Sequence, residues 1–218
     1  MPAPRAPRLA AGEDLPAPPQ QARSLERRRK LLEAGRILFG RKGYEAASIE
    51  DITAHAGAAS GAFYLYFRSK RQLLLVLMNE LIQRLASLDL RPQGAADMRL
   101  GLRRFLAEAF RADVRYFGVV RAWQEAALSD AGLGRMQAAL ARWTEARILR
   151  VFQALQKHPD ARPAPDLRTF ARMMDRHFWS LLARGSQLPA RDFHREIDTA
   201  ADVIYYYLFR DPVREPER

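Results

Sequence analysis

The chain lacks several features that mark other classes of protein. It has no cysteine in 218 residues, so it has no disulfide framework and we expect a cytoplasmic protein. Its longest unbroken apolar run extends from Leu73 to Met78, far short of the ~20 residues that a membrane-spanning helix needs. The first residues are rich in proline and do not resemble a signal peptide. We therefore expect no membrane partner.

Recognisable motifs for catalysis and metal binding are also missing. The serine in 57–61 stands one position late for a nucleophile elbow, and no strand precedes it. Gly132 and Gly134 lack the third glycine of a dinucleotide fingerprint. His177 has no second histidine or cysteine at ligand spacing. We expect a protein that is not an enzyme, with no cofactor and no metal.

The chain does carry an excess of positive charge, +11 at pH 7. Basic proteins favour polyanions, because phosphates that are neutralised by Lys and Arg release their counterions. The excess also fits a general bias of this sequence toward arginine. Charge alone therefore leaves the partner open, and a motif is needed to identify it.

The apolar pattern predicts an all-α fold, since no segment alternates like a strand with hairpin turns. Residues 1–22 are rich in proline and alanine without an apolar period, which predicts a disordered tail. Further divisions fall at 23–70, 71–210 and a C-terminal tail at 211–218. Beyond Pro92 the breaks predict helices near 97–112, 114–129, 134–157, 167–185 and 191–209.

Local signals in the N-terminal part are sharper. Ser48, with Asp51 three residues later, is a variant of the capping box and opens a short helix. Gly57 ends that helix, because glycine readily adopts the left-handed conformation such a turn requires. Ser69 is the N-cap candidate of a long helix over 70–88, which is apolar almost all round in its first turns. Such a helix must be buried between two parts of the protein.

Residues 48–67 combine these signals into a helix-turn-helix: a helix of about two turns, a tight turn and a second short helix. The major groove of B-DNA admits one helix, and the preceding helix fixes its angle of entry. Gly61 and Ala62 place little bulk on the second helix, which permits close approach to DNA. The motif predicts a DNA-binding protein.

The segment from Arg28 to Leu77 resembles the tetracycline-repressor (TetR) family of bacterial regulators. The resemblance is carried, in order, by Leu31, Leu32, Ala34, Leu38, Phe39, Gly43, Tyr44, Ser48, Ile49, Asp51, Ile52, Ala56, Gly57, the run Gly61 to Phe67, Ser69, Lys70, Leu73 and Leu74. It implies a three-helix DNA-binding head at 23–70, a homodimer, and a larger C-terminal helical domain at 71–210 that binds a small-molecule inducer. That C-terminal part matches in helical layout and length only.

The resemblance also implies which residues meet DNA. The recognition helix would cover 60–66, with phosphate contacts on either side. The expected DNA-binding residues are Ser48, Ala59, Ser60, Gly61, Ala62, Tyr64, Leu65, Tyr66 and Lys70. The two tyrosines would hydrogen-bond phosphates, and Lys70 would contact one as a point charge.

The chain departs from the family pattern where bases are read. Ala58 stands where valine is usual, Ala59 and Ser60 where polar and basic residues are frequent, and Leu65 where histidine or another polar residue is frequent. Without Arg, Asn or Gln there, strong bidentate base contacts are unavailable from this helix. We expect specificity from thymine methyl groups, from Ser60, from DNA shape, and from the basic arm at 23–30 reaching a minor groove.

The C-terminal domain is expected to hold the effector and the dimer interface. Candidates for lining a ligand cavity are Phe105, Phe117, Trp123, Trp143, Met174 and His177. Few polar anchors stand among them, which indicates an apolar or amphipathic effector. The last two helices have apolar faces broad enough for a partner as well as a core. Candidates for the dimer interface are Phe170, Phe178, Leu181, Ile197, Ile204, Tyr205 and Leu208.

These features predict a ligand-responsive regulator, a repressor, that binds double-stranded operator DNA as a homodimer and is released by its effector. The helix over 70–88 is the covalent bridge between the two domains, so an effector that displaces it would change the spacing of the two recognition helices. Two alternatives stay open. One is a nonspecific DNA-binding protein, and the other is a helical interaction module that retains the helix-turn-helix only as packing.

Overall fold

The computed structural model describes residues 5–88, 97–185 and 187–209. Over these ranges the chain is helical, apart from turns and one isolated bridge between Ala161 and Phe209, so the predicted all-α class is confirmed. The first helices are α1 (Ala22–Lys42), α2 (Ile49–His55), α3 (Ser60–Phe63) and α4 (Lys70–Ser87). The others are α5 (Met98–Asp113), a 3-10 turn (Val114–Tyr116), α6 (Phe117–Ser129), α7 (Ala131–Leu155), α8 (Leu167–Arg184) and α9 (Ala190–Leu208).

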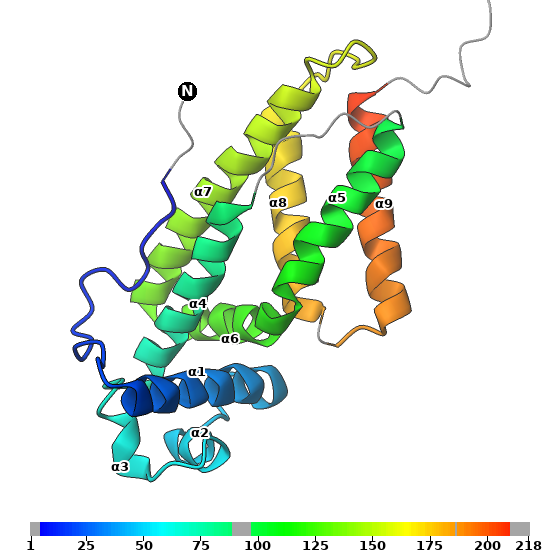
Figure 1. Ribbon diagram of the computed structural model, residues 1–218. Coiled ribbons are helices and arrows are strands. Elements are labelled where there is room, and N and C mark those ends of the chain that lie inside the picture. The colour runs from blue at the N-terminus through cyan, green and yellow to red at the C-terminus, as the bar shows by residue number, and fades with distance from the viewer. Residues whose placement is uncertain (1–4, 89–96, 186, 210–218) are drawn as a thin grey trace, which may run out of the picture.

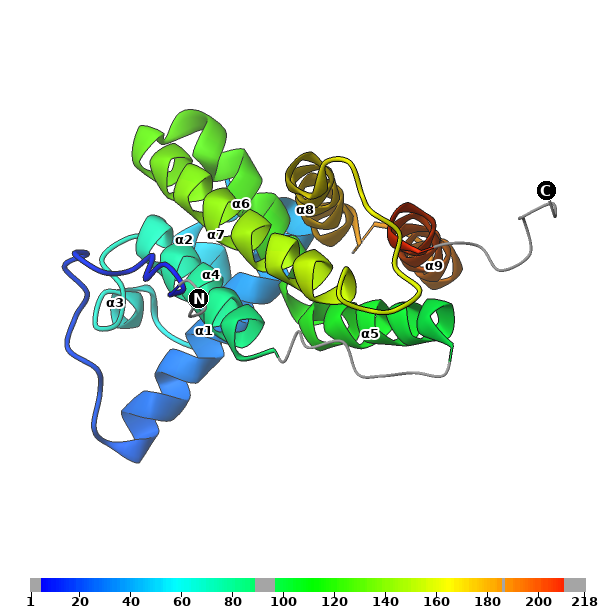
Figure 2. The ribbon, with the colours of Figure 1, turned by 90° about the horizontal axis from the view of Figure 1, so that it is seen from above.

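The helices form a small head, α1 to α3, below a larger body, α5 to α9 (Figure 1). Helix α4 rises from the head along α7, and α6 crosses the base of the body next to α1. Seen from above, α8 lies between α7 and α9, while α5 runs along one side of the body (Figure 2). No helix within the described residues is long and apolar enough to cross a membrane.

The local signals in the head are confirmed. Ser48 accepts a hydrogen bond from the Asp51 N–H, and the Asp51 carboxylate accepts one from the Ser48 N–H, which completes the capping box of α2. Gly57 has φ +64°, the left-handed conformation expected at the turn. Ser69 accepts from the N–H of Gln72 and caps α4.

Aspartates start three helices of the body. Asp97, Asp130 and Asp166 each accept backbone N–H groups of the first turn of α5, α7 and α8. Asp130 accepts from two such groups, so α7 begins at Ala131 and includes glycines that the sequence pattern treats as a break. A good N-cap therefore outweighs the modest cost of glycine in a first turn.

Helix α4 forms the junction between head and body. Every residue from Gln72 to Met78 is buried, which confirms that this helix lies between the two parts.

A second junction lies between α1 and α6, where Gly40 and Gly118 pass each other closely. A Cβ added to Gly118 would lie 2.1 Å from the Gly40 Cα, so the two helices approach at a distance that no side chain permits.

Residues 5–21 form no helix but lie against the protein instead of standing free as a disordered tail. Leu9 is buried with the core, and the Glu13 carboxylate lies 2.5 Å from the guanidinium of Arg71. Asp14 pairs with Arg68 at 2.9 Å. Leu9, the partly buried Ala6 and Leu15, and two carboxylates hold the segment. These residues follow no regular apolar period, so the sequence gives no pattern that predicts the contacts.

Candidate nucleic-acid interface

The recognition helix is a single turn, Ser60–Phe63, followed by a turn that continues to Tyr66. It is anchored from beneath by Phe63 and Phe67, which are fully buried with ring centroids 5.5 Å apart. The Tyr66 and Phe67 N–H groups both donate to the Phe63 carbonyl. The anchor is therefore fully buried, while the outward side carries both small and large residues.

The outward side of this helix is open to solvent. Ala59, Ser60 and Gly61 are exposed, and Tyr64 and Leu65 expose 55% and 63% of their surface. Two large exposed side chains therefore stand at the position where contact with DNA is expected. We call these five residues the recognition face. Ala62, also expected at the interface, is half-buried beside it.

Two other expected contacts have structural roles in the head. Tyr66 is 6% exposed and belongs to the core. The Ser48 hydroxyl accepts from the Asp51 N–H at 3.0 Å, so one of its hydrogen-bonding sites is used for capping. The Lys42 ammonium lies 2.8 Å from the Asp51 carboxylate and lowers its pKa to about 2. The capping carboxylate is therefore ionised at neutral pH.

Lys70, expected at a phosphate, is engaged inside the protein. Its ammonium donates to the carbonyl of Tyr44 at 2.6 Å and to that of Glu45 at 3.2 Å. It also lies 4.5 Å from the centre of the Tyr44 ring, within range of a cation–π interaction. These partners stand on the turn between α1 and α2, about 25 residues earlier.

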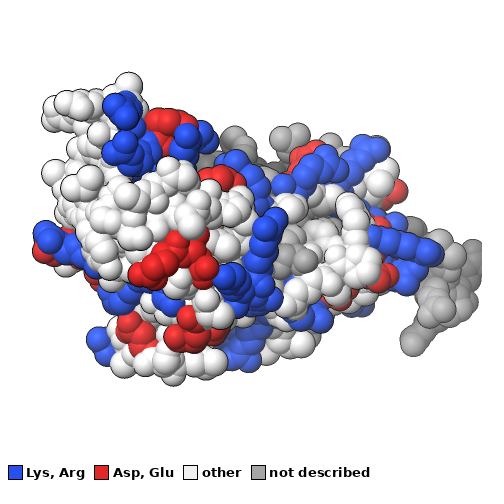
Figure 3. Space-filling model, turned by 90° about the horizontal axis from the view of Figure 1, so that it is seen from below, with Lys and Arg blue, Asp and Glu red and all other residues white. Residues whose placement is uncertain are grey.

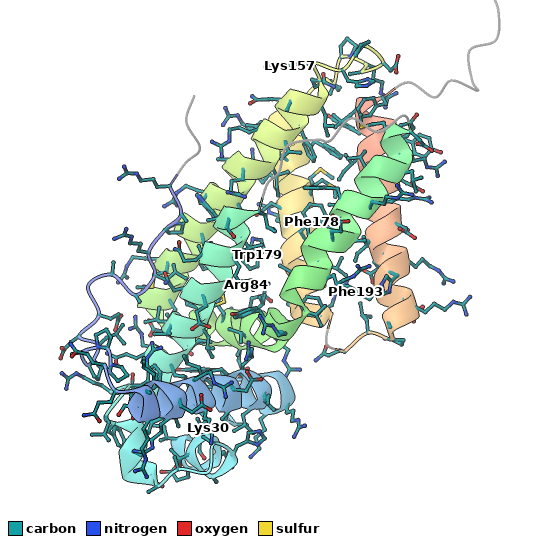
Figure 4. All side chains as sticks on the ribbon, in the orientation of Figure 1. Lys30, Arg84, Lys157, Phe178, Trp179 and Phe193 are labelled. Carbon is teal, nitrogen blue, oxygen red and sulfur yellow. The ribbon has the colours of Figure 1, made fainter. Side chains whose placement is uncertain are left out.

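The basic arm at 23–30 forms the first turns of α1. Arg29 pairs with Glu26 at 2.7 Å, and the Arg28 guanidinium lies 5.4 Å from the Phe67 ring centre. Lys30 is exposed below α1 (Figure 4). The underside of the molecule carries basic groups interspersed with acidic ones, beside a broad area of neither charge (Figure 3). This face is therefore not a uniform basic patch.

The body contains an apolar cavity of about 150 Å³ between α4, α5, α7, α8 and α9. Two of the predicted ligand residues, Phe105 and Trp143, lie in its wall. Further wall residues include Leu85, Leu102, Phe110, Ile148, Phe152 and Leu182. Phe178 and Trp179 reach it from α8, toward the middle of the body (Figure 4).

The other predicted ligand residues lie outside the wall of this cavity. Phe117 and Trp123 are buried in α6, where the indole N–H of Trp123 donates to the side chain of Gln137. Met174 is buried and His177 half-buried in α8. Apolar spacing does not distinguish a residue that fills the core from one that borders a void.

The polar residues of the cavity wall already have partners. Thr144 accepts from the Trp179 indole N–H at 3.2 Å and donates to the backbone of its own helix. Arg147 donates to the Leu85 carbonyl in the last turn of α4 at 2.8 Å. Asp175 is 4% exposed, and burial raises the pKa of its carboxyl to about 6. Sequence reasoning missed Arg147 and Asp175 because their surroundings come from other helices.

The predicted dimer-interface residues mostly serve the core of the single chain. Those with less than a tenth of their surface exposed are Phe170, Leu181, Ile197, Ile204 and Leu208. Phe178 lines the cavity, and Tyr205 is half-buried. The large apolar side chains that α8 and α9 expose are Met173, Val203 and Tyr206.

In the described ranges no three acidic or histidine side chains gather into a metal site.

The sequence of the head is similar to that of known proteins. Residues 31–77 match the family model of bacterial regulatory proteins of the tetR family. The matched segment runs from α1 into α4 and identifies the head as a DNA-binding domain of the tetR-family type. The Tn10 TetC protein of Escherichia coli is 50% identical over 44 residues, 20% of this chain, and the A-factor receptor protein of Streptomyces griseus is 34% identical over 61 residues, 28% of this chain. The chain spans 22% of each relative's length, so the sequence similarity is confined to the TetR head.

Solved structures extend the likeness from the head to the whole fold. The SmeT–triclosan complex superimposes with a TM-score of 0.63 at 23% identity, covering 88% of this chain and 96% of that one. GusR of Salmonella enterica gives a TM-score of 0.61 at 18% identity, covering 83% and 95%. At these identities the likeness establishes the fold of the body, a larger helical domain behind a helix-turn-helix head.

Proposed function

We propose that this TetR-family chain is a repressor that binds operator DNA as a homodimer and is released by a small apolar or amphipathic effector. One observation carries the proposal: helix α4 joins the recognition head to the wall of an apolar cavity. Its first residue, Lys70, is hydrogen-bonded to the Tyr44 carbonyl in the head, and Leu85 in its last turn lines the cavity. A ligand in the cavity therefore touches the element that positions the head.

The recognition face supports shape-dependent reading of DNA. Ala59, Gly61 and Leu65 offer apolar contact to thymine methyl groups, and Ser60 offers a hydroxyl. Tyr64 is exposed beside them and has a phenol that suits a phosphate oxygen. A nonspecific DNA-coating protein needs a broadly basic surface, whereas the underside of this molecule has mixed charge (Figure 3).

The cavity supports a compact, mainly apolar effector. At about 150 Å³ it matches the engineered cavities that bind benzene. Arg147 donates to carbonyls in the last turn of α4 as well as bordering the cavity, so a ligand that displaces it releases that end of the helix. In a dimer, a small movement of α4 changes the distance between two recognition helices that must meet half-sites about 34 Å apart.

A homodimer through α8 and α9 fits their exposed surfaces. Met173 on α8 and Val203 and Tyr206 on α9 expose between 42% and 60% of their surface. These side chains, more than the buried ones beneath them, are available to a second copy.

The test is fluorescence anisotropy with the upstream intergenic DNA of the chain's own gene against a scrambled duplex, across a salt series. Tight binding to the upstream DNA that persists at moderate salt is the expected result. Equal affinity for both duplexes, falling steeply with salt, would instead favour nonspecific binding. Absence of binding to any duplex would favour the interaction module.

A further inference from the structure

The turn between α1 and α2, residues Gly43 to Glu45, is held by a carboxylate from the body. Glu125 of α6 accepts the N–H of Tyr44 at 2.8 Å through Oε2 and the N–H of Glu45 at 3.0 Å through Oε1. Two parallel N–H groups on one carboxylate form a charge-assisted pair that fixes both distance and direction. The partners lie about 80 residues apart in the chain.

The same turn is held from its other side by α4. The ammonium of Lys70, which can only donate hydrogen bonds, donates to the carbonyls of Tyr44 and Glu45. A carboxylate thus takes the N–H groups of these residues while an ammonium takes their carbonyls. Body and linking helix meet on one short segment of the head.

The backbone around the turn is shaped for this contact. Gly43 has φ +83°, and a Cβ there would lie 2.6 Å from the Glu125 carboxylate. One turn earlier in α1, the carbonyl of Gly40 accepts from Arg121 of α6 at 3.2 Å. The close crossing of Gly40 and Gly118 brings α6 near enough for both contacts.

We propose that Glu125 and Lys70 are positioning residues that together set the orientation of the DNA-binding head. The turn that they hold leads directly into Ser48, the N-cap of α2, and α2 packs on α3. Movement of α6 or of α4 is therefore transmitted to the recognition face through non-covalent contacts as well as through the chain. The effect on DNA binding rests on the proposed function, whereas the junction itself does not.

The variant Glu125→Gln separates this role from simple packing. Glutamine has the same shape, but its side-chain NH₂ group faces a backbone N–H where the carboxylate has a second acceptor. The pair of bonds therefore cannot form. Glu196→Gln is the matched control, because this substitution removes the same charge from the body. Glu196 pairs with Arg184 there, at 3.2 Å.

The junction is tested by pulsed electron–electron double resonance on the full chain. The chain has no cysteine, so spin labels on Glu50→Cys in α2 and Gln153→Cys in α7, both exposed positions, report the distance between head and body. Glu125→Gln is expected to broaden or shift this distance distribution, and Glu196→Gln to leave it unchanged. An unaltered distribution in a folded Glu125→Gln variant would overturn the proposal.

Lys70→Met provides a second variant in case Glu125→Gln does not fold. It removes the other half of the junction and should change the distance distribution in the same sense. If Lys70 served only as a phosphate contact, this variant would leave the distribution of the DNA-free protein unaltered, and that result too would overturn the proposal.

DNA affinity then tests the consequence of the junction. Both glutamine variants lose one negative charge, which by itself strengthens attraction to phosphates slightly. A misplaced head has the opposite effect, so Glu125→Gln is expected to bind the upstream duplex about tenfold more weakly than Glu196→Gln. Equal affinities would overturn the link to DNA binding. If the unmodified chain binds no duplex, the proposed function fails while the spin-label result still decides the junction.

Discussion

The head and the body of this protein are packed for different tasks. The head buries Phe63 and Phe67 fully beneath the recognition face. The body contains a cavity of about 150 Å³ and a buried carboxyl, Asp175. A solid domain presents a fixed surface to DNA, whereas an incompletely filled one can gain stability when a ligand enters. This difference in packing fits the proposed division of labour, in which the head reads DNA and the body senses an effector.

The largest effect is expected from emptying the core of the head. Phe63→Ala should lower the free energy of unfolding by about 3–5 kcal/mol, because a fully buried ring is removed, and should abolish DNA binding. Denaturant unfolding followed by circular dichroism measures the loss. Leu65→Ala, at an exposed position, is the control and should leave stability nearly unchanged. Similar losses for both variants would contradict the division between anchor and recognition face.

The next effect concerns the buried carboxyl of the body. The folded-state pKa of Asp175 is about 6, above its ordinary value of 3.8, so its ionisation destabilises the fold above that pKa and the penalty disappears as pH falls toward 4. Asp175→Asn should therefore be more stable than the unmodified chain at pH 8, by up to about 3 kcal/mol.

The pH dependence provides the check on this second prediction. Thermal unfolding between pH 4 and pH 8 should show that the advantage of Asp175→Asn shrinks as the pH falls through 6. An advantage that stays constant over this range would show that the carboxyl is not the cause. A shrinking advantage would place an electrostatic cost of folding in the body, at Asp175.

Alanine substitution at two glycines compares the tightly packed α1–α6 junction with the open recognition face. Gly118→Ala should destabilise the protein by about 1–3 kcal/mol, because its Cβ would meet the backbone of Gly40. A Cβ at Gly61 meets nothing within 4 Å, so Gly61→Ala should be neutral or slightly stabilising while weakening DNA binding. Parallel melting and anisotropy measurements compare the pair. An unchanged DNA affinity of Gly61→Ala would show that a close approach of DNA to this position is not required.

The smallest effect is expected at the N-terminal segment. Glu13→Gln removes a partly buried ion pair with Arg71, which also pairs with Asp130. The free energy of unfolding should fall by about 1 kcal/mol or less at low salt, and the difference should shrink at high salt. Arg142→Gln, at an exposed position on α7, serves as a surface control. A salt-independent loss would show that the contact is not electrostatic.

The features that could be predicted from the sequence are those whose cause lies close by in the chain. The capping box at Ser48, the left-handed Gly57 and the cap at Ser69 depend on neighbours within four residues. The buried α4 also follows from its own apolar run. These signals, with their order along the chain, were enough to predict a head of the TetR type and the all-α class.

The residues that resisted prediction depend on distant partners. Lys70 is held by a turn about 25 residues away, and Glu125 by one about 80 residues away. In the body, Phe117 and Trp143 look alike as apolar helix positions, yet only Trp143 borders the cavity. A void is a property of several packed helices together, so no single stretch of sequence encodes it.

Arg147 lies where the body contacts the last turn of α4, so its substitution measures how far the body controls the head through this helix. Arg147→Met removes the hydrogen bond to the Leu85 carbonyl at the end of α4, and Arg142→Met removes the same charge from the exposed side of α7. Anisotropy with the upstream duplex should show about tenfold weaker binding for Arg147→Met than for Arg142→Met. Equal affinities for the two folded variants would contradict control through α4.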